Sequence, residues 1–307
     1  MEQVLVSTNG VRLNVAQDGP AGGPLLILLH GFPEFWYGWR KQIPAFAQAG
    51  YRVWAPDQRG YNLSDKPRGS RAYTLDVAAA DVAGLIDAAG RDRAYVVGHD
   101  WGGAVAWMMG TDYPERLHKL VVLNAPYGSA LLKRLRHDPV QRRRSWYMFY
   151  FQLPWLPEIT SRRNNWRLLT GMLERSGLPG TFSESEIAEY RRAWSLPGAY
   201  TGMLGWYRAM RHAGVRRRQP PAPGTRTAPV TVPTLLLWGA KDRFLGRELA
   251  EESIRKCSQG RLVYLEDATH WLHHERPDQV NALIHDFIRE PGGQPAQQGR
   301  QPPEEPL

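Results

Sequence analysis

Short apolar runs alternate with amphipathic stretches along this chain, and that alternation restricts its fold more than any other feature of the sequence. Between the runs, WRKQIPAFAQAG (39–50) and TLDVAAADVAGLIDAAG (74–90) place apolar residues at helical spacing. Strands that alternate with helices predict an α/β fold built on a doubly wound, mostly parallel sheet. The runs, which end at polar, glycine or proline residues, are VRLNVAQDG (11–19), PLLILLH (24–30), YRVWAPD (51–57), RAYVVGHD (93–100) and KLVVLNAP (119–126).

The alternation stops after residue 127 and resumes with VTVPTLLLWGAKD (230–242) and GRLVYLEDATH (260–270). The interrupting segment is rich in Trp, Arg and Pro, and we expect a helical insertion, here called the cap, that ends in a basic Pro/Gly-rich linker. The C-terminal residues lack apolar periodicity and are expected to form a disordered tail. The predicted organisation is a first core part (1–127), the cap with its linker (128–230), a second core part (231–288) and the tail (289–307).

Positive charge is concentrated in the cap. Residues 128–230 hold 18 Lys and Arg against 6 Asp and Glu, a balance of +12, so the rest of this +9 chain carries −3. Basic runs such as QRRRS are one feature of nucleic-acid-binding proteins, but no nucleic-acid-binding motif accompanies them, and charge runs usually solvate a surface. We therefore expect no nucleic-acid partner.

The sequence also indicates a compartment. Its single cysteine, Cys257, excludes an internal disulfide and fits a reducing environment. The apolar run at 24–30 is far shorter than the ~20 residues that a membrane-spanning helix needs, and no basic segment of a signal peptide precedes it. We expect a cytoplasmic protein without a membrane span.

The segment GHDWG (98–102) joins a predicted strand to the helical stretch GGAVAWMMGTDYP (102–114). Small residues around a sharp strand-to-helix turn are typical of a nucleophile elbow, which pushes its central residue, here Asp100, out above the sheet. The alternative is an ordinary turn whose aspartate caps the helix.

Two further residues complete a catalytic triad in the chain order nucleophile, acid, base. Asp242 and His270 each lie just past a predicted strand. The Asp242 carboxylate would orient the His270 imidazole and stabilise its charged form, while the imidazole activates a water. Taken singly, a turn aspartate and a surface histidine are the simpler interpretations, but their joint placement after successive strands favours the triad.

The histidine cluster His270, His273 and His274 raises the question of a metal site. It lacks the HExxH pattern of zinc enzymes, and the sequence shows no partner ligands elsewhere. We expect no metal and no other cofactor.

A carboxylate at the elbow suits one class of reaction. A serine that attacked a saturated carbon would leave an ether, which a histidine-activated water cannot hydrolyse, whereas a carboxylate leaves an ester, which it can. Asp100 therefore predicts substitution at saturated carbon, with epoxides or alkyl halides as substrates.

Four segments carry a resemblance to a known family. They resemble the α/β-hydrolase fold epoxide hydrolases over about residues 3–288, which implies a helical cap inserted after the sixth strand, a small-molecule epoxide as substrate and a diol as product. The segments are HGFPEFWYGWRKQ (30–42), DQRGYNLSDKP (57–67), GHDWGG (98–103) and ATHWLHHERP (268–277).

The resemblance assigns an oxyanion hole. The backbone N–H groups of Phe32, in the His-Gly-X-Pro motif, and of Trp101, after the nucleophile, would hold the oxyanion of the ester's tetrahedral intermediate. One departure is Asn62, where the family often has glycine. Because asparagine tolerates the left-handed conformation, we expect this loop to be retained.

Opening an epoxide also requires an acid, because the departing alkoxide is a poor leaving group. Tyrosine, with a pKa near ~10, stays protonated at neutral pH beside a carboxylate. In the resembling family two cap tyrosines donate this proton, and they match Tyr147 and Tyr207 here. Tyr150, three residues after Tyr147, could share its helix face, so the first donor stays open between the two.

Two other functions fit parts of this pattern. Haloalkane dehalogenases are similar in nucleophile and base, and Trp101 suits their halide site, but they usually place a halide-binding side chain where this chain has Phe32 and have no use for paired tyrosines. A non-catalytic ligand receptor on the same fold would not need an intact triad. Several aromatic residues are expected to line an apolar substrate pocket, namely Trp36, Phe149, Trp206 and Trp271, with Trp146 and Trp155 as further candidates.

Overall fold

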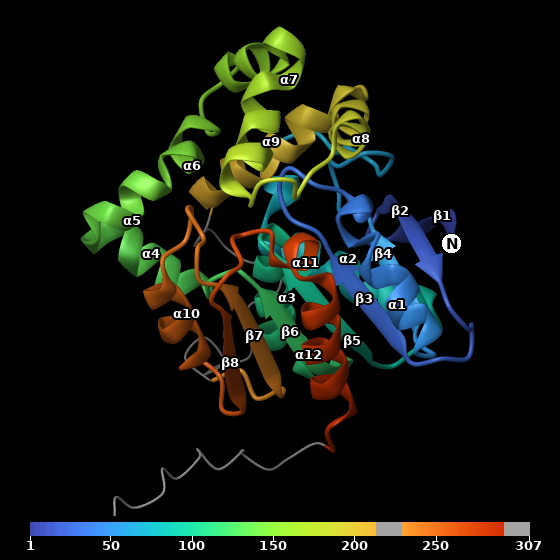
Figure 1. The fold of residues 1–307 in the computed structure, drawn as a ribbon. Coiled ribbons are helices and arrows are strands. Elements are labelled where there is room, and N and C mark those ends of the chain that lie inside the picture. The colour runs from blue at the N-terminus through green and yellow to red at the C-terminus, as the bar shows by residue number, and fades with distance from the viewer. Residues whose placement is uncertain (213–228, 292–307) are drawn as a thin grey trace, which may run out of the picture.

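The computed structural model describes residues 1–212 and 229–291, which form one eight-stranded sheet in the order β1-β2-β4-β3-β5-β6-β7-β8 (Figure 1). Strand β2 pairs antiparallel with β1 and with β4, and the other six strands run parallel. The strands are β1 (Glu2–Thr8), β2 (Val11–Asp18), β3 (Leu25–Leu29), β4 (Arg52–Pro56), β5 (Ala94–His99), β6 (Leu117–Leu123), β7 (Thr234–Gly239) and β8 (Gly260–Leu265).

The predicted α/β-hydrolase fold is confirmed, and the structure adds one strand to the apolar runs. Every residue of β3 and of β7 is buried, which is why central strands covered by helices on both faces appear in the sequence as continuous apolar runs. Strand β1 was not among those runs because it is an edge strand whose side chains are mostly exposed.

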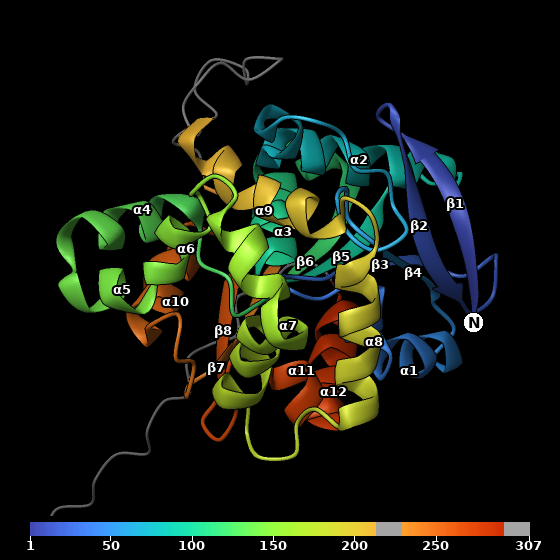
Figure 2. The same cartoon turned by 90° about the horizontal axis from the view of Figure 1, so that it is seen from above.

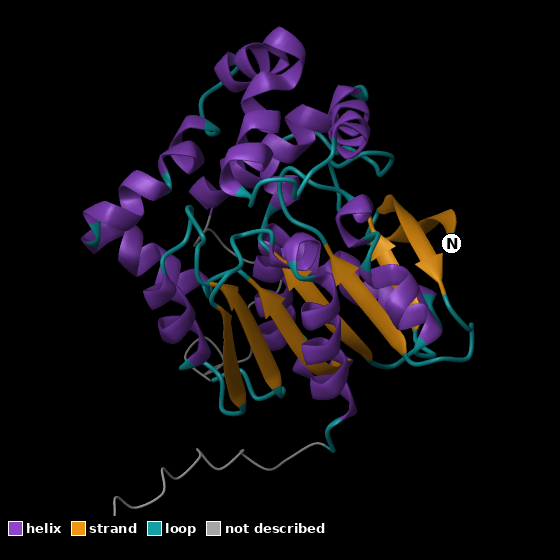
Figure 3. Ribbon diagram, viewed as in Figure 1, coloured by secondary structure: helices purple, strands orange, loops and turns teal. Residues whose placement is uncertain are grey.

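Helices cover both faces of the sheet, as Figures 2 and 3 show. Helices α1 (Gln42–Gln48) and α12 (Pro277–Arg289) lie on one face, and α2 (Leu75–Ala88) and α3 (Trp101–Asp112) lie on the other. Helix α10 (Arg247–Ile254) packs against β7 and β8. The remaining short elements of the core are η1 (Trp36–Trp39), η2 (Ser70–Tyr73), η3 (Pro114–Arg116) and α11 (Leu272–Glu275).

The insertion after β6 is helical, and its helices gather beyond the carboxyl ends of the parallel strands (Figure 1). Helix α9 rests on the core, where the Trp206 indole N–H donates to the carbonyl oxygen of Arg59. Part of the predicted linker, 213–228, and most of the predicted tail, 292–307, lie outside the described residues. The inserted elements are α4 (Gly128–His137), α5 (Pro139–Arg144), α6 (Trp146–Tyr150), α7 (Leu156–Ser176), α8 (Glu184–Ser195), α9 (Ala199–Ala209) and η4 (Met210–His212).

The turn between β5 and α3 is too tight for side chains on its inner side. A Cβ atom on Gly102 would lie 2.1 Å from the carbonyl oxygen of Leu29, and one on Gly98 would lie 2.2 Å from that of Gly102. Between these glycines, Asp100 adopts φ +50° and ψ −117°, a strained conformation for a residue with a side chain. The close backbone approach therefore lifts the Asp100 side chain above the sheet edge.

Asn62, the departure in the DQRGYN loop, adopts the left-handed conformation that asparagine tolerates. Asn62 adopts φ +37°, and its side-chain amide donates to the buried carboxylate of Asp57. Asp57 also accepts the backbone N–H of Trp36 and the side-chain amide of Asn14, so one carboxylate ties three segments together.

Gly102→Ala tests the packing of this turn. The added methyl group meets backbone that cannot rotate away, so we expect it to lower the free energy of unfolding by about 1–3 kcal/mol, the usual cost of overpacking, as measured by urea denaturation. Gly128→Ala is the control, because a Cβ at that first residue of α4 meets nothing within 4 Å. Equal stability of the two variants would contradict the packing argument.

Candidate active site

The loops after β5, β7 and β8 bring Asp100, Asp242 and His270 together at the carboxyl edge of the sheet. Nδ1 of His270 lies 2.7 Å from Oδ2 of Asp242, and Nε2 of His270 lies 3.8 Å from Oδ2 of Asp100. The Asp242 and His270 side chains are almost fully buried, whereas the Asp100 side chain is 17% exposed. The His270 imidazole therefore lies between the buried Asp242 carboxylate and the partly exposed Asp100 carboxylate.

Asp242 is surrounded by donors. The Asn124 side-chain amide donates to its Oδ2, and the backbone N–H groups of Phe244 and Leu245 donate to its Oδ1. Burial alone would raise the pKa of Asp242, but the charge of His270 and these hydrogen bonds outweigh it and hold the pKa below its usual value. Asp242 is therefore ionised at neutral pH. The only sequence signal for Asn124 is its position directly after β6.

The pKa of His270 is shifted in the opposite direction. Burial lowers the pKa of His270, but the neighbouring charges of Asp242 and Asp100 raise it by a larger amount. The net pKa of His270 therefore lies above the ordinary imidazole value. The imidazole is therefore a stronger base than a histidine in water, with Nδ1 held by Asp242 and Nε2 directed at Asp100.

One of the two predicted oxyanion-hole donors contacts the Asp100 carboxylate. The Phe32 N–H donates to Oδ1 of Asp100 over 2.8 Å, on the opposite oxygen from the one that faces His270. Trp101 is the first residue of α3, and the first N–H groups of a helix have no acceptor within it. A hydrogen bond from the Trp101 N–H to the same oxygen stays a prediction.

Tyr147 from α6 and Tyr207 from α9 face this carboxylate across a cavity. Both side chains are buried, with ring centroids 6.1 Å apart. Burial and the negative charge of Asp100 raise both pKa values well above that of free tyrosine, so both phenols are protonated at neutral pH. Tyr150 is placed differently, because its hydroxyl pairs with that of Thr160 in α7 and its side chain does not line the cavity.

The cavity is small and partly open to solvent. Its wall is mainly apolar, with one carboxylate, one imidazole and two phenols directed into it, a composition common in small-molecule sites. The lining residues are Phe32, Pro33, Asp100, Tyr147, Met172, Tyr207, Phe244, His270 and Trp271.

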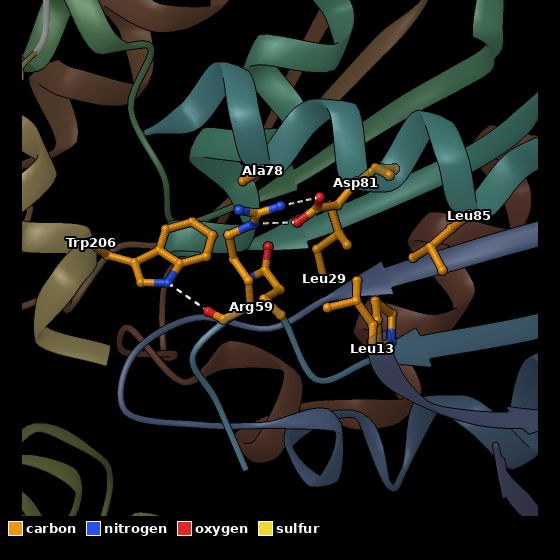
Figure 4. A pocket seen from close by; sticks show the side chains of 10 residues that line it. Leu13, Leu29, Arg59, Ala78, Asp81, Leu85 and Trp206 are labelled. Atoms are coloured by element: carbon orange, nitrogen blue, oxygen red, sulfur yellow. Dashed lines mark hydrogen bonds and ion pairs between the residues drawn. The ribbon is translucent and has the colours of Figure 1, made fainter. Parts of the chain in front are cut away.

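Of the six aromatic residues expected to line this pocket, Trp271 lies in the cavity wall and the other five do not. Phe149 points outward and is 51% exposed. Trp36 is buried in the core beside Phe35. Trp206 lines a second small cavity, where Figure 4 shows it near the buried Arg59–Asp81 ion pair. Helical spacing and aromatic character cannot tell which neighbour covers a given side chain.

A buried polar network that no sequence motif indicated lies behind His270. Glu34 accepts the Tyr190 hydroxyl and Nε2 of His274 over 2.6 and 2.7 Å. Burial alone would raise the pKa of Glu34, but the surrounding histidines hold it well below its usual value. His99 donates from Nε2 to the carbonyl oxygen of His270 over 2.9 Å, so this network supports the loop that carries the imidazole.

The same network corrects the expectation that the histidine cluster has no partner ligands. Donor atoms of Glu34, His99 and His273 lie within 4.8 Å of one another, and all three residues are buried. In the described part of the chain this is the group whose donors suit a divalent transition metal. It lies behind His270 and does not line the cavity.

Asp242→Asn tests the cause of the His270 shift. Loss of the Asp242 charge removes the largest contribution that raises the pKa of His270, so we expect that pKa to fall in an NMR titration of labelled histidines, while Asp286→Asn, at an exposed position on α12, leaves it unchanged. In the native protein the folded pKa exceeds the unfolded one, so the stabilisation by protonated His270 is complete below the unfolded pKa and is lost as pH rises through the folded pKa. An unchanged His270 titration in Asp242→Asn would refute this account.

Comparison with known proteins agrees with this geometry, beginning with the fold. Residues 24–277 match the family described as alpha/beta hydrolase fold, so the chain is a member of that class of proteins. It is 45% identical to AB hydrolase superfamily protein YfhM of Bacillus subtilis, over 92% of this chain and 96% of the relative. It is 36% identical to epoxide hydrolase 4 of Homo sapiens, over 94% of this chain and 78% of the relative.

Two solved structures of epoxide hydrolases have the same fold. An epoxide hydrolase of Bacillus megaterium in complex with an inhibitor has a TM-score of 0.80 and 29% sequence identity, and the match covers 94% of this chain and all of that chain. Epoxide hydrolase A of Mycobacterium thermoresistibile has a TM-score of 0.80 and 32% identity, over 94% and 98% of the two chains. Within the α/β-hydrolase fold family, this chain belongs to the epoxide hydrolases. Among the described residues, no helix is both long and apolar enough to cross a bilayer.

Proposed function

We propose that this protein hydrolyses epoxides to vicinal diols through a covalent ester on Asp100. The observation that carries the proposal is the pair of buried phenols, Tyr147 and Tyr207, facing a carboxylate that an Asp–His pair adjoins. The names of the relatives support the substrate class. We further propose that helices α4–α9 act as a cap domain whose function is to bring the two tyrosines over the nucleophile.

In the first half-reaction, Oδ2 of Asp100 attacks one carbon of the epoxide ring. A new carbon–oxygen ester bond forms as the ring carbon–oxygen bond breaks, and the released alkoxide takes a proton from Tyr147 or Tyr207. Oδ1 of Asp100 stays on the Phe32 N–H and becomes the carbonyl oxygen of the ester. Two phenols on one oxygen stabilise the charge that develops there.

In the second half-reaction, His270 takes a proton from a water as that water attacks the Asp100 carbonyl carbon. The Phe32 and Trp101 N–H groups hold the resulting oxyanion, and Asp242 stabilises the charged imidazole. As the ester bond breaks, His270 returns its proton to the leaving oxygen, and the proton left on Asp100 restores the tyrosine. The net reaction adds one water to the epoxide and needs no cofactor.

His270→Gln separates the two half-reactions. Asp100 can still attack, but no base activates water, so we expect the ester to accumulate. Intact-protein mass spectrometry after incubation with styrene oxide should show one adduct with the mass of the whole epoxide, which peptide mapping places on Asp100.

The control for this experiment is the double variant Asp100→Ala/His270→Gln, which should remain unmodified. An alkyl adduct formed only from a haloalkane, with halide released, would instead identify a dehalogenase. A His270→Gln protein that stays unmodified while the native protein converts the same epoxide would exclude the ester mechanism.

Phenylalanine substitutions test the proton donors. Tyr147→Phe and Tyr207→Phe should each slow ester formation by up to about 10² to 10⁴-fold, the range of general acid catalysis, and the double variant should be nearly inactive. Single losses are partly compensated because both donors serve one oxygen. Tyr150→Phe is the matched control and should not change the rate, because its hydroxyl faces Thr160. A silent Tyr147→Phe together with an impaired Tyr150→Phe would move the assignment to Tyr150.

A further inference from the structure

One edge of the cap exposes large apolar side chains close together in the chain. Trp155 is 76% exposed, Trp146 is 56% exposed and Ile159 is 51% exposed. The hydroxyls of Tyr150 and Thr160 pair, so the end of α6 and the start of α7 lie against each other. We call this set the apolar edge; its members are Trp146, Phe149, Leu153, Trp155, Leu156 and Ile159.

The apolar edge consists of residues directed away from the protein. In α6, Trp146 and Phe149 are exposed, whereas Tyr147 and Met148 on the same turns are buried. The helix therefore has an inner side at the cavity and an outer side that nothing in the described residues covers. Exposed apolar groups gathered in one place usually mark a surface that binds something.

Positive charge flanks the apolar edge on both sides along the chain. Arg142, Arg143 and Arg144 precede it, Arg162 and Arg163 follow it, and all five side chains are exposed. The described residues provide no ion pair to these five arginines.

Two acidic side chains near the apolar edge are already engaged, while the exposed Glu248 lies close to Arg144 without forming an ion pair with it. Glu158 pairs with Arg208, and Asp138 pairs with Arg134 and accepts two backbone N–H groups at the start of α5. Five exposed arginines against this one free carboxylate leave the edge with a net positive charge. Helices α4, α5 and α6 lie toward one side of the molecule in both views (Figures 1 and 2), away from β1 and β2.

We infer that the apolar edge and its flanking arginines bind the surface of an anionic lipid membrane. Tryptophan, phenylalanine and leucine beside arginine form the combination that inserts at the boundary between headgroups and acyl chains. Tryptophan favours that boundary because its ring is apolar and its N–H is polar. Anionic headgroups supply the negative charge that the protein does not provide.

Two other occupants fit less well. A second copy of this chain, docked through the same edge, would bring its own arginines against these five, and like charges oppose such a pairing. The phosphates of a nucleic acid would pair with the arginines, but they would leave the apolar side chains of Leu153, Leu156 and Ile159 in contact with water. A bilayer satisfies both components of the surface.

The arrangement also places the membrane near the cavity. Tyr147 lines the cavity from α6, whose outer side carries Trp146 and Phe149. One helix diameter, about 10 Å, therefore separates the bilayer surface from the cavity wall. The binding surface itself does not depend on the proposed reaction.

Vesicle sedimentation tests the inference. At low salt, the full-length protein should sediment with vesicles of phosphatidylcholine mixed with phosphatidylglycerol, and much less with vesicles of phosphatidylcholine alone. Trp155→Ser/Ile159→Ser should lower the partition coefficient at least about tenfold, because burial of one large apolar side chain contributes more than that factor. Arg142→Glu/Arg143→Glu should lower it at least about 25-fold, since each basic residue near an anionic surface contributes about fivefold.

Matched controls change similar residues elsewhere on the surface. Leu5→Ser/Leu63→Ser and Arg93→Glu/Arg289→Glu alter exposed side chains of the core and should leave vesicle binding unchanged. Thermal unfolding midpoints equal to that of the native protein show that the variants are folded.

Three results would overturn the inference. The first is native protein that does not sediment with the anionic vesicles, or that sediments equally with neutral ones. The second is undiminished vesicle binding by folded Trp155→Ser/Ile159→Ser, particularly if sedimentation velocity shows that this variant converts a dimer to a monomer. The third is binding of a labelled oligonucleotide that the Arg142→Glu/Arg143→Glu variant loses while its vesicle binding persists.

Discussion

The close approach of the start of α3 to the end of β3 is the constraint on which the site depends. Gly98 and Gly102 allow backbone to contact backbone there, and the turn between them holds Asp100 in a conformation that costs a side-chain-bearing residue about 1–3 kcal/mol. Packing of α3 against β5 and β6 offsets that cost. The result is a carboxylate with a backbone donor on one oxygen and an imidazole facing the other.

The remaining polar groups stabilise buried charges. A buried charge is costly unless it is paired and hydrogen-bonded. Asp242 accepts hydrogen bonds from a side-chain amide and two backbone N–H groups besides its contact with His270, so it stays ionised although its side chain is fully buried. Glu34 follows the same rule deeper in the protein, where Tyr190 and His274 donate to it. Both carboxylates limit the positions that the loop carrying His270 can adopt.

Local patterns were sufficient for the parts of the site that depend on local structure. The elbow at Asp100 could be predicted because a strand, small residues and a helix follow one another directly in the sequence. The choice between Tyr147 and Tyr150 could not, because a spacing of three residues on an ideal helix allows both to share a face. In the structure α6 has only five residues, and its two ends pack against different neighbours. Phe149 and Trp206 were misassigned for the same reason, since an aromatic residue does not specify what will cover it.

The sequence by itself determined seven of the eight strands, the insertion after β6, the strand-to-helix turn at Asp100 and the chain order of Asp100, Asp242 and His270, because these follow from periodicity and from motifs a few residues long. Only the tertiary structure decided which side chains line the cavity and that Glu34 and His99 lie behind the loop that carries His270. His274 and Glu34 are 240 residues apart and meet because the sheet places β3 and β8 so that their carboxyl ends share one edge. Such contacts depend on strand order and on the packing of distant segments, which no local spacing encodes.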